Sequence, residues 1–142
     1  MTNSPKDFEV AVCKTDKEFR VTVCKQYEFS AAHDLPLVPE NHRCRNLHGH
    51  NYVVEVEVNA SVLINGMVMD FFGLDQIMEE IIKTIDHRYL NHIIGLENPT
   101  AENISIWIGK KVENRLRFLL NNVNLTRLRV YETPTCWAEL QY

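Results

Sequence analysis

Apolar and polar residues alternate in several stretches of the chain, and this period-two pattern predicts β-strands. Residues 8–14 and 19–25 alternate on either side of the turn signal "TDKE", which predicts a hairpin. The second strand continues to His33, and every second side chain from Tyr27 onward lies on the same side of it. Two prolines then interrupt the pattern and predict a loop over residues 34–41.

A second long alternating run covers residues 48–60. Its histidines, tyrosine and three valines (48, 50, 52, 54, 56 and 58) fall on one face, and Glu55 and Glu57 fall on the other. The dipeptide "NG" at residues 65–66 predicts a turn. We therefore expect this strand to have one buried face and one polar face.

The period changes to that of a helix over residues 74–85, where apolar residues recur at i, i+3, i+4, i+7, i+8 and i+11. A second helix is expected after Thr100, a suitable N-cap, and should run to about Leu120. Two more strands are expected over residues 125–133 and 136–142. Strands, two helices and strands in this order predict an α+β fold, with an antiparallel sheet and both helices on one face.

Length and composition are those of one ordinary globular domain, residues 1–142, with 45% hydrophobic and 24% charged residues. The net charge of −4 argues against nucleic acid as the main partner. There is no apolar run of membrane-spanning length, and we expect no secretory signal at the N-terminus. The four cysteines form no C-x-x-C pair, so we expect free thiols and a reducing cytoplasm.

Three histidines are the first candidates for chemistry. His48 and His50 project from the same face of one strand, and His33 ends another strand on its apolar side. If these strands pair, three imidazoles can converge, and three neutral histidines are a common catalytic zinc set with an open fourth position. The alternative is that they are ordinary hydrogen-bonded groups. His42 and His92 have no such partners and are expected at the surface.

Cys44 has three interpretations that its spacing does not separate. It could be a fourth ligand that closes a structural zinc site, a catalytic thiolate beside the metal, or an inert buried thiol. Asp86 and His87 stand at the end of the first predicted helix and could transfer protons, or the histidine could simply complement the helix dipole. Glu132 lies on the apolar side of its strand, so it needs a donor, either an arginine or a ligand with N–H groups.

The motifs "FSAAH", "CRNLHGHNY", "GMVMDF", "IDHRYLN", "GLENPTAEN" and "VYET", in this order, resemble those of the 6-pyruvoyltetrahydropterin synthase superfamily. The resemblance covers about residues 26–142. Three residues separate Cys44 from the "HGH" motif, and together with "DF" and "YLN" this resembles the 6-carboxy-5,6,7,8-tetrahydropterin synthases of the queuosine (7-deazaguanine) pathway.

This resemblance implies the tunnelling (T-) fold, in which three subunits close their sheets into a barrel and two trimers form a hexamer. It implies a zinc-dependent lyase that converts 7,8-dihydroneopterin triphosphate to 6-carboxytetrahydropterin with release of acetaldehyde and triphosphate. The pyruvoyl synthase acting on the same substrate is the nearest alternative. A non-enzymatic zinc module closed by Cys44 is the alternative from another class, and a zinc hydrolase is a weaker one.

The resemblance also implies the roles of individual residues. Zn2+ would be held by the three histidines at 33, 48 and 50, and Cys44 would be a catalytic acid/base. Asp86 and His87 would form a proton relay supplied by a neighbouring subunit. The pterin would be anchored by Glu132, and the rest of its pocket would be lined by Thr133, Thr100 and Glu102.

The chain departs from the family pattern in two places. Residues 1–25 include an N-terminal extension, for which the sequence suggests only the extra hairpin. Asp34 stands where the family usually carries a basic residue, and a carboxylate there would repel a triphosphate. Arg43, Arg45 and Lys25 are the candidate replacements for the missing positive charge.

Overall fold

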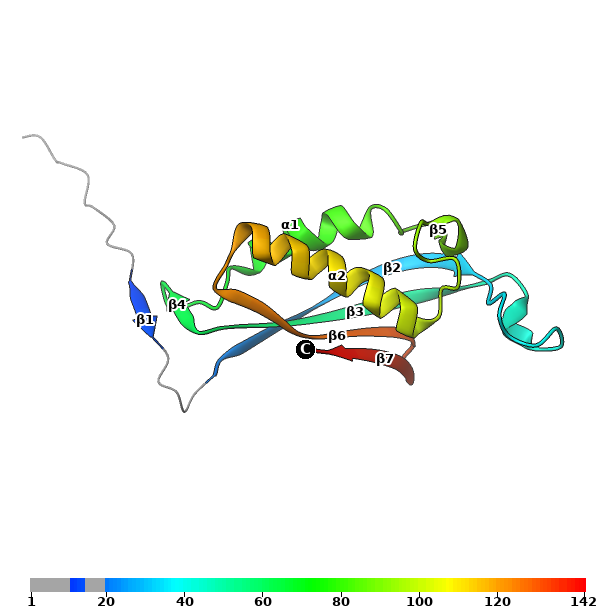
Figure 1. The fold of residues 1–142 in the computed structure, drawn as a ribbon, viewed down its shortest axis with the longest axis horizontal. Helices are drawn as coiled ribbons and strands as arrows, with labels where there is room; N and C mark the ends of the chain where they lie inside the picture. Colours follow the sequence, from blue (N-terminus) through cyan, green and yellow to red (C-terminus); the bar gives the residue numbers. More distant parts are fainter. Residues whose placement is uncertain (1–10, 15–19) are drawn as a thin grey trace, which may run out of the picture.

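The computed structural model describes residues 11–14 and 20–142. Its elements in chain order are β1 (Val12–Lys14), β2 (Thr22–His33), η1 (Arg43–Arg45), β3 (His48–Ala60), β4 (Val62–Ile64), α1 (Phe71–Ile82), β5 (Arg88–Tyr89), η2 (Leu90–His92), α2 (Ala101–Leu119), β6 (Val123–Thr133) and β7 (Cys136–Gln141). A five-stranded sheet has the order β5-β2-β3-β6-β7, and both helices lie on one of its faces (Figure 1). The α+β class and the helix placement are as predicted.

The five-stranded sheet is mixed, so the prediction of a purely antiparallel sheet is wrong. Strand β5 pairs in parallel with the end of β2, whereas all other neighbours in this sheet are antiparallel. The reason is the direction of the chain, because α1 runs over the sheet from β4 toward the end of β2 (Figure 1). The segment that follows α1 therefore reaches the edge of β2 in the same direction as β2.

The predicted N-terminal hairpin is also wrong within the described residues. Strand β1 pairs with β4, with Val12 opposite Ile64, while the start of β2 pairs with β3. The Asn65-Gly66 turn follows β4, and Asn65 bonds to Ala11 through both its backbone and its side chain. Residues 8–10 and 15–19, which complete the predicted hairpin, lie outside the described residues.

The predicted turn at residues 65–66 is confirmed. Asn65 and Gly66 both have positive φ, 53° and 77°, and Ile64 and Met67 exchange two backbone hydrogen bonds of 3.0 Å across them. Two consecutive positive φ angles are the requirement of the tight hairpin turn that the "NG" dipeptide favours.

Helix α1 begins and ends three residues before the predicted range. Its N-cap is Asp70, whose carboxylate accepts from the backbone N–H of Phe72 at 2.9 Å. Phe71 and Phe72 in the first turn are exposed, so the apolar periodicity only becomes visible from Leu74. Ile85 keeps the period but lies in the turn beyond the helix, where it is fully buried.

Helix α2 agrees with its prediction. The Thr100 hydroxyl accepts from the backbone N–H of Asn103 at 3.2 Å, as an N-cap should, and the helix continues to Leu119. Residues 125–133 and 136–142 are also confirmed as the last two strands, within two residues at each end.

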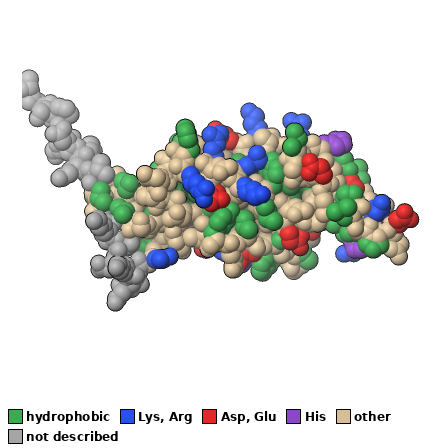
Figure 2. Space-filling model, in the orientation of Figure 1, with side chains coloured by type: hydrophobic (Ala, Val, Ile, Leu, Met, Phe, Trp, Pro, Cys, Tyr) green, Lys and Arg blue, Asp and Glu red, His purple; other side chains and the backbone are tan. Residues whose placement is uncertain are grey.

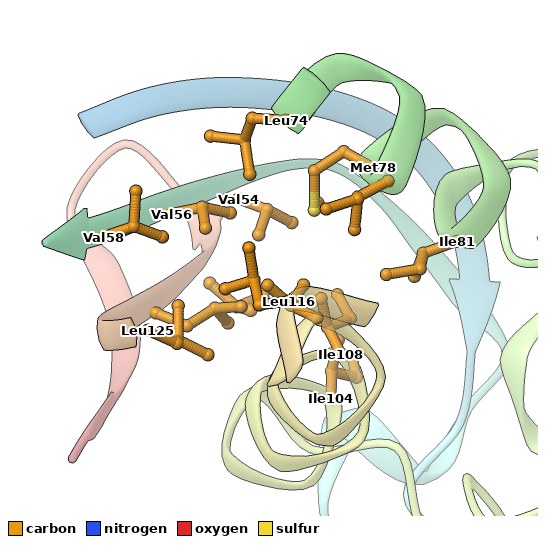
Figure 3. Close-up of a cluster of buried hydrophobic side chains, with 14 of the residues drawn as sticks. Val54, Val56, Val58, Leu74, Met78, Ile81, Ile104, Ile108, Leu116 and Leu125 are labelled. Atoms are coloured by element: carbon orange, nitrogen blue, oxygen red, sulfur yellow. The ribbon is translucent and has the colours of Figure 1, made fainter. Parts of the chain in front are cut away.

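The core lies between the helices and the sheet (Figure 3). Val54, Val56 and Val58 of β3 face it and are fully buried, whereas Glu55 and Glu57 between them point to the opposite face. The helices and β6 supply the other labelled side chains, which are Leu74, Met78, Ile81, Ile104, Ile108, Leu116 and Leu125. The predicted apolar and polar faces of residues 48–60 are therefore confirmed.

The opposite face of the sheet carries ion pairs. Arg127 lies 2.6 Å from Glu55, 3.0 Å from Glu57 and 3.4 Å from Glu139, and Arg129 lies 2.6 Å from Glu139. On the face seen in Figure 2, basic and acidic side chains are interspersed.

None of the helices in the described part of the chain has the length and apolar character needed to cross a membrane.

Gly49 occupies a position where β2 and β3 approach closely. A Cβ atom at residue 49 would lie 3.1 Å from the backbone oxygen of Ala31, which is tighter than ordinary contacts and cannot be relieved by a side-chain rotation. A glycine between His48 and His50 therefore lets the two strands keep their spacing at this end of the sheet.

Replacing Gly49 with alanine should lower the free energy of unfolding by about 1–3 kcal/mol, because the added methyl group pushes the two backbones apart. Gly73→Ala is the matched control. Its Cβ would meet only the Met69 side chain at 3.6 Å, within helix α1. It should raise the free energy of unfolding by about 0.5–1 kcal/mol. Urea unfolding at one protein concentration measures both. An unchanged stability for Gly49→Ala would contradict the steric argument.

Candidate metal centre and surrounding site

The three candidate histidines converge at one end of the sheet. In the register of β2 with β3, His33 stands opposite His48, and Ala31 stands opposite His50. Paired residues of antiparallel strands point to the same face, so all three imidazoles lie on the helix side. One ligand atom from each ring lies within 4.8 Å of the others. The start of α2 and the β6–β7 turn lie at the same end (Figure 1).

Backbone carbonyls fix the orientation of two of the rings. Nδ1 of His33 lies 2.8 Å from the oxygen of Pro99, and Nδ1 of His48 lies 2.7 Å from the oxygen of Asn46. A carbonyl oxygen can only accept, so both Nδ1 atoms carry the proton and both Nε2 atoms present lone pairs. Carbonyl partners of this kind commonly orient the histidine ligands of metals.

The Nε2 atoms of His33 and His48 lie 3.0 Å apart. Two acceptors at this distance repel each other unless a cation or a proton lies between them. Ligands about 2.0–2.1 Å from a tetrahedral zinc ion are about 3.3 Å from each other, so a metal fits the spacing. Among the described residues, the close group contains these three histidines and no other potential ligand, which leaves a fourth tetrahedral position open.

The protonation state of the histidines also suits a metal. Burial lowers the pKa of both His33 and His50, although the nearby Glu132 carboxylate partly opposes this. At neutral pH these imidazoles are therefore uncharged, which is the form that binds metals. His33 is only 1% exposed and bonded to Pro99, so the alternative interpretation of these histidines as ordinary hydrogen-bonded groups could hold for it only as a core group.

Cys44 does not belong to the histidine cluster in this structure. It lies in η1 and is half-buried, and its backbone N–H donates to Nδ1 of His42 at 3.1 Å. Its thiol is free, as are those of Cys24 and Cys136, which agrees with the predicted absence of disulfides for these three residues. The arrangement supports neither a closed four-ligand site nor a fully buried inert thiol.

Glu132 lies beside the cluster without an arginine partner. Its Oε1 is 3.9 Å from Nε2 of His33, and no hydrogen bond to its carboxylate is found within the described part of the chain. The register of β6 with β7 shifts between Tyr131 and Thr133, so Glu132 sits at a bulge. Bulges of this kind redirect a side chain out of the regular sheet. The Glu132 carboxylate is thus about three-quarters buried, and its oxygens accept no hydrogen bond from the described part of the chain.

The other predicted pocket residues lie close to Glu132 or at the start of α2. Thr133 accepts with its hydroxyl from the backbone N–H of Cys136 at 3.1 Å. Thr100 caps α2 next to Pro99, the residue that orients His33. Glu102 lies exposed in the first turn of the same helix. All three therefore belong to segments that border the histidine end of the sheet.

Asp86 and His87 form a pair, but they lie beyond helix α1 rather than on it. Nδ1 of His87 is 2.9 Å from Oδ1 of Asp86, and the same carboxylate oxygen accepts from the backbone N–H of Ser30. These donors lower the pKa of Asp86, the Ser30 N–H most strongly. His87 lies well beyond Ile82, where α1 ends, so it does not serve the predicted role of a helix-end histidine. Its φ of 54° is a left-handed conformation that is uncommon outside glycine.

The Asp86–His87 pair has no hydrogen bond or ion pair with the three histidines of its own chain, as far as the described residues go. His87 instead borders an open hollow of about 560 Å³ at the ends of β2 and β3, together with His50, Arg88 and Tyr89. The hollow is also lined by Ser30, Ala32, Gly49 and Asn51. These residues alternate along β2 and β3 with those on the histidine side, so they belong to the opposite face of the sheet.

Both the side chain and the backbone of Asp34 have hydrogen-bond partners within the chain. Its carboxylate accepts a hydrogen bond from the hydroxyl of Tyr89, and its backbone is held by the Asn91 side chain through bonds of 3.1 and 2.8 Å. The Asp34 carboxylate raises the pKa of Tyr89. His42 and His92 are exposed, as predicted.

Sequence reasoning missed several groups that shape this site. The carbonyls of Pro99 and Asn46 orient two of the candidate ligand histidines, and Ser30 holds the Asp86–His87 pair. Tyr52 was placed on the histidine face, but its hydroxyl contact with His33, at 3.2 Å, was not foreseen. Backbone partners leave no residue-type signal, so only the position of Pro99 inside the "ENPTAEN" stretch could have drawn attention to it.

Three characterised or assigned relatives are similar to the chain over most of its length. A protein of Archaeoglobus fulgidus, provisionally named 6-carboxy-5,6,7,8-tetrahydropterin synthase, is 42% identical over 113 residues, covering 80% of this chain and 89% of the relative. The 6-carboxy-5,6,7,8-tetrahydropterin synthase of Synechocystis is 40% identical, covering 64% and 74%. The dihydroneopterin monophosphate aldolase of Pyrococcus furiosus is 35% identical, covering 80% and 91%.

A solved structure has the same fold. The 6-pyruvoyl tetrahydropterin synthase of Caenorhabditis elegans superposes with a TM-score of 0.74 at 28% identity, covering 87% of this chain and 96% of its own. Residues 22–142 match the family described as 6-pyruvoyl tetrahydropterin synthase. The stretch includes the histidine cluster, Glu132 and the Asp86–His87 pair, and by this match the chain belongs to the 6-pyruvoyl tetrahydropterin synthase family.

Proposed function

We propose that this protein is a zinc-dependent lyase that converts 7,8-dihydroneopterin triphosphate to 6-carboxy-5,6,7,8-tetrahydropterin, releasing acetaldehyde and triphosphate. Family membership and relatives named for this activity support a pterin-directed enzyme. We expect it to act in the cytoplasm as a homo-oligomer, a hexamer built from two trimers in which three sheets close a barrel.

The single observation that carries this proposal is the unpaired Glu132 carboxylate 3.9 Å from a three-histidine cluster. A carboxylate that is three-quarters buried at a bulge, without an arginine, is costly unless a ligand supplies the donors. The pterin ring offers adjacent N–H groups at its 2-amino and N3 positions, which match two carboxylate oxygens. Thr133, Thr100 and Glu102 would complete the walls of this pocket.

The cluster of His33, His48 and His50 would hold the zinc ion, with one position open for the substrate side chain. When bound, the metal supplies Lewis acidity that lowers the pKa of a coordinated hydroxyl group. The carbonyls of Pro99 and Asn46 keep two of the imidazoles in the tautomer that this requires.

Protons would be moved by Cys44 and by the Asp86–His87 pair. Asp86 accepts from Nδ1 of His87 and so leaves Nε2 free to exchange a proton with the substrate. Because the pair has no bond to the histidine cluster of its own chain in the described residues, we propose that it serves the site of a neighbouring subunit. Cys44 would act as an acid/base at the open position rather than as a ligand.

Two related activities are the main alternatives. A pyruvoyl synthase would eliminate triphosphate from the same substrate without breaking a carbon–carbon bond. The Pyrococcus furiosus relative favours a third outcome, an aldolase reaction on dihydroneopterin monophosphate. Cleavage of the side chain there would release a phosphorylated two-carbon aldehyde, whereas the proposed reaction releases acetaldehyde.

The products distinguish these activities. Incubating the zinc-loaded protein with 7,8-dihydroneopterin triphosphate should yield acetaldehyde and 6-carboxytetrahydropterin, identified by mass spectrometry. A 6-pyruvoyl product without acetaldehyde would replace the proposed activity with the synthase reaction. Turnover of the monophosphate alone, with a phosphorylated aldehyde as product, would identify the aldolase.

His33→Ala should reduce bound zinc to well below one ion per chain, because it removes a ligand whose Nε2 faces that of His48. Elemental analysis of the purified protein measures this directly. His42→Ala is the matched control, since His42 is exposed and lies outside the cluster. Equal zinc contents in the two variants would refute the assignment of His33 as a ligand.

Cys44→Ala should retain the zinc content and the fold of the parent protein but lose turnover by about 100-fold or more, which is a typical contribution of a general acid or base. Circular dichroism, elemental analysis and the product assay measure the three properties. Loss of zinc together with unfolding would instead favour a closed structural site in which Cys44 is the fourth ligand.

A further inference from the structure

Two of the three basic residues expected to replace the missing charge at Asp34 are engaged elsewhere. Lys25 forms an ion pair of 2.6 Å with Asp75, and it is eight residues before His33, which is about 26 Å along an extended strand. The guanidinium of Arg45 donates to the carbonyls of Pro36 and Val38, at 3.1 and 2.8 Å, and so holds the 34–41 loop. Lys25 is therefore already paired and far from His33, and Nη1 of Arg45 is committed to the loop.

Arg88 is another candidate for the positive charge that Asp34 does not provide. It borders the hollow of about 560 Å³, next to His87 and near His50. No carboxylate pairs with it in the described part of the chain, whereas four other arginines there form ion pairs with glutamates. The third expected residue, Arg43, does not line this hollow.

The backbone that carries Arg88 is fixed at both sides. Strand β5 pairs with β2 so that Arg88 stands opposite Ala31, and the N–H of the preceding His87 donates to the oxygen of Ser30 at 2.6 Å. The left-handed φ of His87 sets the direction in which the chain enters β5. Local strain of this kind persists only where surrounding contacts impose it.

We propose that Arg88 binds the phosphate chain of a phosphorylated pterin, with the guanidinium next to the Asp86–His87 pair. This inference rests on the proposed function. A guanidinium can donate two parallel hydrogen bonds to a phosphate, and an exposed arginine without a carboxylate partner has those donors free. Arg88 would supply, from β5, the positive charge that Asp34 does not supply at the end of β2. The Tyr89 hydroxyl donates to the Asp34 carboxylate, which fixes its position and leaves its negative charge in place.

The test compares two oxidised pterins that cannot turn over, neopterin and neopterin triphosphate, which differ only in the phosphate chain. Their dissociation constants for the zinc-loaded full-length protein are measured by fluorescence titration. In the parent protein the triphosphate should bind more tightly. Arg88→Gln should reduce this advantage by about tenfold or more while leaving neopterin affinity unchanged, because only charge-assisted bonds to phosphate are lost.

Three further variants sharpen the result. Arg88→Lys keeps the charge but not the two-pronged geometry, so it should retain part of the advantage. Lys83→Gln removes one exposed positive charge at the end of α1 and should change nothing. An advantage that survives Arg88→Gln, or that is lost in Arg43→Gln instead, overturns the proposal. Equal binding of both pterins by the parent overturns only the anion site, whereas binding of neither overturns the proposed function as well.

Discussion

Strands β2 and β3 are held in one antiparallel register by the apolar side chains that their shared face buries. Phe29 stacks on Tyr52 with ring centroids 4.8 Å apart. The valines that follow on the same face of β3 are fully buried beneath the helices. A slip by one residue would turn the valines to the polar face and bury Glu55 and Glu57. The same slip would carry His48 and His50 to the wrong side, so the packing of the core also positions these candidate metal ligands.

Much of this was predictable from the sequence because it follows from side-chain periodicity. The alternation through residues 48–60 identified the buried face, and the N-cap of α2 was recognised from Thr100. Pairings made by short segments were not predictable in this way. Strand β5 has two residues and β1 has three, which is too short for a period, and their partners lie 48 or more residues away in the chain.

The candidate site shows the same division. Which histidines share a face can be read from spacing, but which nitrogen each presents depends on carbonyls of Asn46 and Pro99. The latter is 66 residues from His33, and a carbonyl is present on every residue. Asp86 and His87 were identified by residue type and assigned to a helix, whereas the observed pairing depends on a left-handed turn that the helical period could not indicate.

The departures from regular structure gather in and around one end of the sheet. Facing lone pairs at 3.0 Å, a bulge under Glu132, a carboxylate without a donor and a left-handed His87 each cost free energy in the isolated chain. A cation bound between the histidines would remove the repulsion of their lone pairs, and a ligand with N–H donors would satisfy the Glu132 carboxylate. The strain at His87 is different, because it orients the Asp86–His87 pair and Arg88 toward a hollow instead of toward the cluster of the same chain. If the Asp86–His87 pair serves the site of a neighbouring subunit, as proposed, activity requires assembly, and oligomerisation and catalysis should then depend on the same residues.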